Sequence, residues 1–153
     1  MKSFTFAVVA MLLSLACHGH AHGEEAIKRL SSEQFSQLKL PFSQAVEVKG
    51  ILYLSGELGV IPGKLILVEG GVIAETRQAL DNIKATLERF GSGMDKVIKC
   101  TLFLADIKEW EQVNRVYIDY FKQGLPARSA VAGSGLGLGA RIEIECMALA
   151  AKP

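Results

Sequence analysis

The chain closes with Arg141-Ile142-Glu143-Ile144-Glu145-Cys146-Met147-Ala148-Leu149-Ala150, and this stretch decides the fold. Its even-numbered residues are apolar, as expected for one face of a β-strand packed against helices. Its odd-numbered residues begin with two glutamates and then turn apolar. A strand that is apolar on both faces is normally buried on both. We therefore expect helices on one face and another subunit on the other.

The preceding sequence supplies the rest of an α+β fold. Apolar residues recur at helical spacing from Ile73 to Phe90, and again after Asp106, where Trp110, Val113, Tyr117 and Tyr120 share one face. Runs rich in β-forming residues predict strands at 45–49, 51–55, 97–104, 129–132 and 141–150. The order ββ-α-β-α-ββ predicts one mixed sheet with two helices packed on one face.

The N-terminus has the pattern of a secretory signal peptide. Met1-Lys2 is basic, residues 4–16 are apolar apart from Thr5 and Ser14, and small residues follow at Ala21 and Gly23. The apolar run is shorter than the roughly 20 residues that span a membrane. We expect a signal peptide at 1–23, an N-terminal arm at 24–39 and one domain at 40–153. The mature protein would then be secreted or periplasmic, without a membrane anchor. Lipid attachment to Cys17 is the alternative.

Composition excludes several kinds of site. The chain has 17 basic and 16 acidic residues, and removal of 1–23 takes away only Lys2, which leaves 16 of each. This balance gives no electrostatic footprint for nucleic acid. All three histidines, His18, His20 and His22, also lie in the leader. The mature chain therefore has no imidazole base and no histidine metal ligand.

Two cysteines remain in the mature chain, Cys100 and Cys146, and both fall inside apolar strands. Free cysteine in such places usually packs as a small hydrophobic residue. Export would permit oxidation, but two cysteines at strand centres rarely meet disulfide geometry. We expect them to be unpaired core residues.

The candidate chemistry lies in two charges near the C-terminus. Arg128 follows Pro126-Ala127, and Glu143 stands fifteen positions later in the last strand. Two strands joined by the glycine-rich segment 133–139 would bring the two charges close together. That segment precedes a strand rather than a helix, so it lacks the helix N-terminus of a phosphate-binding loop, and we expect a hairpin connection. A guanidinium can bind both oxygens of a carboxylate, while a glutamate can position a water.

Several motifs resemble the Rid family, also called YjgF, whose members deaminate enamines and imines. They are Pro126-Ala127-Arg128-Ser129, Leu54-Ser55-Gly56-Glu57, Gln78-Ala79-Leu80-Asp81-Asn82-Ile83 and Val113-Asn114-Arg115-Val116-Tyr117, within a likeness spanning residues 40–150. The resemblance implies the fold of trimeric bacterial chorismate mutases. It also implies a homotrimer whose sheets form a central barrel, with active sites in the clefts between subunits.

The resemblance also implies roles for single residues. Arg128 matches the family's substrate-carboxylate arginine and Glu143 its water-positioning glutamate, whereas Glu145 has no such role. Ser55 and Gly56 match a backbone wall of the pocket, and Asn114 an amide that supports the site. Phe42 stands where many relatives have tyrosine, and Ala130 where cysteine is frequent.

The resulting expectation is hydrolysis of 2-iminoacids to 2-ketoacids and ammonia, with no metal or cofactor. The alternative is a trimer of the same fold that binds a small ligand or a protein without turnover; the more apolar Phe42 and Ala130 favour it. A ribonuclease activity, attributed to some relatives, is disfavoured by the neutral charge and the absence of histidine.

Overall fold

A computed structural model describes residues 26–151, so the expected signal peptide and cleavage site lie outside the described residues. The helices are α1 (Glu33–Ser36), α2 (Gly71–Arg89) and α3 (Trp110–Tyr117), with 3-10 turns at Met94–Lys96, Ile107–Glu109, Ile118–Tyr120 and Gly137–Gly139. The strands are β1 (Lys28–Leu30), β2 (Ala45–Val48), β3 (Ile51–Leu54), β4 (Glu57–Leu58), β5 (Val97–Leu104), β6 (Ala127–Ala132) and β7 (Ile142–Leu149).

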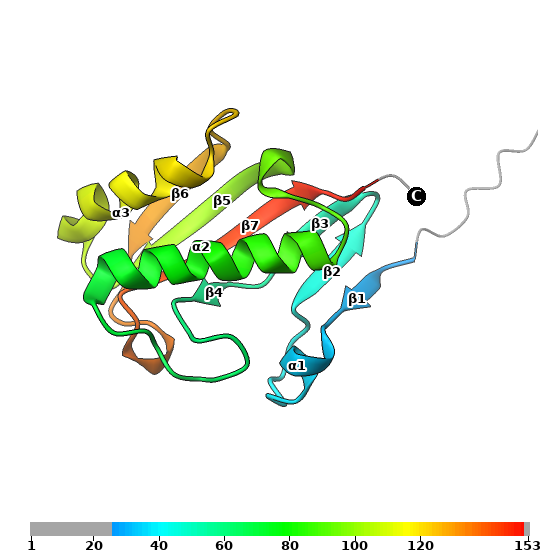
Figure 1. Ribbon diagram of the computed structural model, residues 1–153, viewed down its shortest axis with the longest axis horizontal. Coiled ribbons are helices and arrows are strands. Elements are labelled where there is room, and N and C mark those ends of the chain that lie inside the picture. Colours follow the sequence, from blue (N-terminus) through cyan, green and yellow to red (C-terminus); the bar gives the residue numbers. More distant parts are fainter. Residues whose placement is uncertain (1–25, 152–153) are drawn as a thin grey trace, which may run out of the picture.

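The strands form one mixed sheet in the order β1-β2-β3-β7-β5-β6, with β4 also paired to β7. Only the pairing of β5 with β6 is parallel. Both long helices cover the same face, and α2 runs across the middle of the sheet (Figure 1). The predicted α+β class, the mixed sheet and the single helical layer are therefore confirmed.

The alternation of the last strand sorts its residues as expected. Ile142, Ile144, Cys146 and Ala148 are buried under the helices, while Glu145 and Leu149 are exposed on the other face. We call this other side the open face; on it lie the exposed apolar side chains Tyr53, Val131 and Leu149. The buried face completes a core with α2 and α3 residues such as Leu80, Ile83 and Val113.

The glycine-rich segment is not a hairpin connection, so that expectation is wrong. β6 pairs in parallel with β5, and β7 pairs antiparallel with the other edge of β5. A strand, a helix and a second strand joined by a crossover place the two strands in parallel, and β5, α3 and β6 form such a unit. Residues 133–141 must therefore pass from the edge strand β6 to β7 beyond β5.

The expected N-terminal arm contributes to the sheet. β1 pairs with β2 along Lys28–Leu30, and α1 follows, with Ser32 accepting a hydrogen bond from the Phe35 amide at 3.1 Å. A serine at this position satisfies one of the free amides at the start of a helix. Within the domain, Ile73 was expected in the core but is exposed in the first turn of α2, and Val72 is buried instead.

Two polar contacts tie the loop after β4 to α2. Asn82 donates to the carbonyl oxygens of Leu58 and Val60 at 3.1 and 3.0 Å. Gly59 approaches the helix so closely that a Cβ atom there would lie 2.5 Å from the Cα atom of Glu75. Glu75 is buried and accepts a hydrogen bond from the Arg141 amide at 2.7 Å, at the start of β7.

No helix among residues 26–151 is long and apolar enough to cross a membrane.

Cys100 and Cys146 form a disulfide, so the expectation of two unpaired cysteines is wrong. They occupy directly opposed positions of β5 and β7, with Cα atoms 4.1 Å apart and both side chains on the buried face. The pattern within each strand gave no sign that the two strands are neighbours in this register. Once they are, opposed cysteines face each other across an antiparallel pair.

Reducing this disulfide should destabilise the protein. The bond closes a loop with a sequence separation of 46 residues, which corresponds to a loss of roughly 2–4 kcal/mol in the free energy of unfolding. Urea unfolding with and without a reductant measures it, and a Cys100→Ala/Cys146→Ala variant, which has no bond to lose, should not respond to the reductant. Alkylation of both thiols in unfolded, unreduced protein would contradict the pairing.

Candidate active site

Arg128 is the second residue of the edge strand β6, and its side chain lies on the helical side of the sheet. It is opposite Cys100 of β5, whose side chain is buried under the helices. Its guanidinium carbon lies 4.8 Å from the ring centre of Tyr117 and 5.8 Å from that of Trp110, both on α3. Two aromatic rings at this distance attract a cation and limit its orientation. The arginine is therefore held against α3.

Glu143 is the second residue of β7 and projects from the open face, next to Gly56. A Cβ atom at Gly56 would collide with the carboxylate of Glu143. Burial raises the pKa of Glu143, and the neighbouring Glu145 raises it further. Glu145 itself is exposed. Glu143 is thus partly desolvated in the space that the missing side chain of Gly56 leaves free, which suits a group that takes up and returns a proton.

Within one chain, Arg128 and Glu143 do not come together, contrary to the expectation from the glycine-rich turn. They lie on opposite faces of the sheet, on strands separated by β5. Two strand spacings amount to about 10 Å before the thickness of the sheet is added. Their registers also differ, because Arg128 is opposite Cys100 whereas Glu143 is opposite Phe103.

The remaining predicted site residues divide between these two places. Asn114 lies on α3 at helical spacing from Trp110 and Tyr117, and its side-chain oxygen is buried without a partner among the described residues. Ala130 follows Arg128 on the same face of β6 and packs against the core. Ser55 adjoins Gly56, and its hydroxyl donates to the Ser43 carbonyl oxygen at 2.8 Å. That bond fixes the segment leading into β2.

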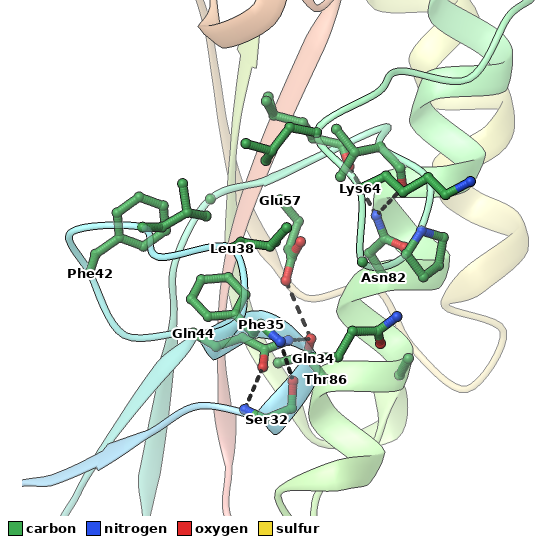
Figure 2. A pocket seen from close by; sticks show the side chains of 18 of the residues that line it. Ser32, Gln34, Phe35, Leu38, Phe42, Gln44, Glu57, Lys64, Asn82 and Thr86 are labelled. Carbon is green, nitrogen blue, oxygen red and sulfur yellow. Dashed lines mark hydrogen bonds between the residues drawn. The ribbon is translucent and has the colours of Figure 1, made fainter.

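Phe42 lies in the loop before β2 at the edge of a pocket of about 310 Å³ (Figure 2). Its ring is half exposed and meets that of Phe35 edge-on, with centres 5.8 Å apart. The pocket lies between the N-terminal arm, α2 and the loop after β4. Its walls are mostly apolar and include Leu38, Leu58, Val60 and Leu65. Gly56 also lines it.

Glu57 is the charged group inside this pocket. Its Oε1 accepts a hydrogen bond from the Thr86 hydroxyl at 3.3 Å, and Gln44 donates to the same hydroxyl at 2.9 Å (Figure 2). Burial raises the pKa of Glu57 to about 7, although the Thr86 hydrogen bond opposes this shift. The carboxyl group therefore exchanges its proton near neutral pH.

Sequence reasoning missed the aromatic partners of Arg128 and the position of Glu57 in the pocket. Trp110 and Tyr117 were expected only as apolar residues of a helix face, because nothing local indicates which strand that face meets. Glu57 was part of a quoted motif, but β4 is only two residues long. Such a short strand has too little alternation to show where a side chain points.

A family model described as endoribonuclease L-PSP matches residues 35–150. The chain belongs to this family. The same membership follows from relatives that include the Rid family protein YyfA from Yersinia pestis, whose crystal structure is 45% identical. That structure has a TM-score of 0.69, and the match covers 71% of this chain and 87% of the other. The YjgF gene product of E. coli gives 33% identity and a TM-score of 0.67, with 71% and 87% covered. The likeness to the Rid family is therefore confirmed.

Among curated Rid relatives, the goat (Capra hircus) 2-iminobutanoate/2-iminopropanoate deaminase is 45% identical over 109 residues, which are 71% of this chain and 80% of the relative. The human (Homo sapiens) protein of the same name is 44% identical with the same coverage.

Gly56→Ala should impair this Rid protein at the site without unfolding it. The added methyl group must displace the carboxylate of Glu143, a movable side-chain end, rather than backbone. We expect turnover of a 2-iminoacid to fall at least tenfold, with the thermal midpoint nearly unchanged. Gly133→Ala is the control, because its Cβ would have only one distant neighbour at 3.9 Å. Equal activity of both variants would show that the position of Glu143 does not matter.

Proposed function

We propose that this protein hydrolyses 2-iminoacids to 2-ketoacids and ammonia, as a 2-iminobutanoate/2-iminopropanoate deaminase-type enzyme. The chain is an enamine/imine deaminase of the Rid family, and its identity to deaminases of that name supports the assignment. One structural observation carries the chemistry. Arg128, stacked on two aromatic rings, and Glu143, with a raised pKa, supply a carboxylate clamp and a proton acceptor.

Arg128 binds the substrate carboxylate. Its planar fork matches the two carboxylate oxygens, which a lysine cannot do. Because Tyr117 and Trp110 lie against the guanidinium, less side-chain freedom is lost on binding. The clamp places the C=N carbon at a fixed distance from the carboxylate and thereby orients it for attack.

Glu143 serves the water that attacks. The water oxygen bonds to the carbon of the iminium form, C=NH2⁺, while the carboxylate takes a proton from the water, which gives a neutral carbinolamine. The carboxyl group then returns that proton to the nitrogen. The C–N bond breaks and ammonia leaves, while the hydroxyl group gives its proton to the carboxylate and forms the C=O bond of the 2-ketoacid. A carboxyl group with a raised pKa can perform these transfers.

Substitutions at Arg128 should weaken substrate binding without unfolding the protein. Arg128→Ala and Arg128→Lys should each reduce 2-iminoacid hydrolysis at least roughly ten- to a hundredfold, because a charge-assisted hydrogen bond is lost or misplaced. Glu143→Gln should still bind a 2-ketoacid while turnover falls. Glu145→Gln, on the same face, should change turnover much less, because burial and not Glu145 is the main cause of the raised pKa of Glu143. Kinetics with freshly generated 2-iminoacid measure these effects.

Near wild-type turnover in Arg128→Ala would contradict the proposed clamp. Binding of the 2-ketoacid by the unaltered protein without any 2-iminoacid turnover would instead favour the non-catalytic trimer.

The opposite placement of the two charges supports an assembly. In a homotrimer whose open faces form a central barrel, a cleft between subunits can combine Arg128 of one chain with Glu143 of the next. The exposed apolar side chains of the open face, including Val131 and Leu149, favour burial against another copy. A head-to-tail interface closes into a ring when the rotation from one chain to the next closes, as it does in a trimer with threefold symmetry.

Mixing two inactive variants tests the shared cleft. In randomly reassembled hybrids of Arg128→Ala and Glu143→Gln, about a quarter of all sites would receive an intact residue from each neighbour, because each site draws on two chains. We expect about that fraction of wild-type turnover after joint refolding, and only the residual turnover of each variant when the two are refolded separately. No recovery in light-scattering-verified trimers would contradict the shared site.

We also propose export to a secreted or periplasmic location. The Cys100–Cys146 disulfide supports it, because such bonds persist in oxidising compartments and are rare in the cytosol. The basic and apolar start of the sequence supports it independently.

The mature N-terminus in the native host should lie near His22 or Glu24. Removal of the leader would reduce the intact mass by the mass of the removed residues. Mass spectrometry of the purified protein measures this difference. A lipid-modified N-terminus at Cys17 would replace the secreted location by an anchored one. A product that begins at Met1 would contradict export.

A further inference from the structure

The pocket beneath the N-terminal arm contains the carboxylate of Glu57, which forms no ion pair with any residue among 26–151. Among residues 26–151, Thr86 provides the hydrogen bond to the Glu57 side chain, and it reaches only Oε1. The ion pairs of the described residues involve other carboxylates, such as Glu47, Glu88 and Glu109. Buried carboxylates are normally paired with a cation or protonated. Glu57 therefore has an oxygen and a charge available to a ligand.

The surroundings of Glu57 are those of a small-molecule site. The pocket volume of about 310 Å³ lies at the lower end of the range for ligand pockets. Its apolar walls come from both sides of the opening, with Phe35 and Leu38 on the arm and Leu58 and Leu65 on the loop that includes β4. Glu57 lies among them, with Thr86 and Gln44 behind it (Figure 2).

We propose that this pocket binds a small primary ammonium compound with an apolar body, whose ammonium group pairs with Glu57. The carboxylate offers a charge partner in a poorly solvated place, where an ion pair is stronger than in water. The apolar body would displace water from Phe35, Leu38 and Leu65. Thr86 holds one carboxylate oxygen, which leaves the other to the ligand.

The two cations of the pocket lining do not neutralise Glu57. Lys64 and Arg89 are both exposed, and the Lys64 ammonium points away from Glu57, beyond Asn82 (Figure 2). They lie at the rim, where water screens their charge. The pocket lining contains no other carboxylate and no histidine. Glu57 therefore decides which ligand charge is accepted.

This site differs from the proposed reaction site. Glu57 is opposite Ile144, whose side chain is buried on the helical face, whereas Glu143 projects from the open face. Gly56 lies between the pocket and the open face: it lines the pocket, and it is also adjacent to the side chain of Glu143. Arg128 lies on β6, beyond β7 and β5. Ligand binding at Glu57 can thus be tested separately from turnover.

Isothermal titration calorimetry with hexylamine, 1-hexanol and hexanoate on the purified mature protein tests the proposal. The three probes have matched apolar chains and differ in charge. At pH 8 we expect saturable binding of one hexylamine per chain, roughly ten- to a hundredfold tighter than 1-hexanol, as for a charge-assisted hydrogen bond. Glu57→Gln keeps the shape of the side chain and should remove this preference. Glu145→Gln and Arg128→Ala are the controls and should bind hexylamine like the unaltered protein.

The pH dependence gives a second readout. The pKa of Glu57 is about 7, and an alkylammonium resembles lysine, whose reference pKa is about 10.4. The affinity for hexylamine should therefore rise about tenfold from pH 6 to pH 8, as the carboxyl group ionises, and Glu57→Gln should abolish this rise. Tighter binding of hexanoate than of hexylamine, or unchanged hexylamine binding in Glu57→Gln, would overturn the proposal. Arg128→Ala should lose 2-iminoacid turnover and still bind hexylamine, and this result would support an ammonium site at Glu57 that is separate from the reaction site.

Discussion

The alternation of β7 is the constraint on which the rest of the molecule depends. This strand pairs with β3, β4 and β5 and packs beneath α2. A shift by one residue would turn two glutamates into the core and every apolar partner out of it. The carboxylates of Glu143 and Glu145 therefore fix the register as firmly as the buried isoleucines do. The same register places Cys146 opposite Cys100, so the disulfide follows from the pairing that the hydrophobic pattern selects.

That constraint also determines how the reaction site can be built. β7 must present Glu143 on the open face, while the parallel pairing with β5 places Arg128 on the helical face. No side-chain rotation moves a group through a hydrogen-bonded sheet. A single chain thus carries one charge of the proposed site on each face of its sheet. The two charges could act on one substrate only if copies packed so that the face of one met the edge of another, which ties the proposed chemistry to the proposed assembly.

Much of the fold could be predicted from the sequence because its signals are local. Helical spacing placed α2 and the helix after Asp106, and β-forming runs placed β5 to the residue. The predictions that were wrong depended on which elements are neighbours in space. The crossover through α3 sets the order of β6, β5 and β7, and the sequence of residues 133–139 does not indicate that order. The same gap hid the disulfide and the stacking of Arg128 on Tyr117. The family resemblance suggested Glu143 and Gly56 as separate site residues, but it did not show that they touch; their contact gives a physical reason for a glycine there.

Gly56 and Glu57 illustrate how adjacent residues serve different environments. Successive side chains in an extended segment point to opposite faces, so the space left by Gly56 opens toward Glu143, and the Glu57 carboxylate enters the pocket under the arm. Each carboxyl group has a pKa raised mainly by burial. Glu143 is also affected by Glu145, a like charge that makes its ionisation harder, and it has an open face before it. Glu57 has instead a hydroxyl partner and apolar walls. The first arrangement suits a group that transfers protons to a passing substrate. The second suits a carboxylate that forms an ion pair with a bound ligand and takes no part in a reaction.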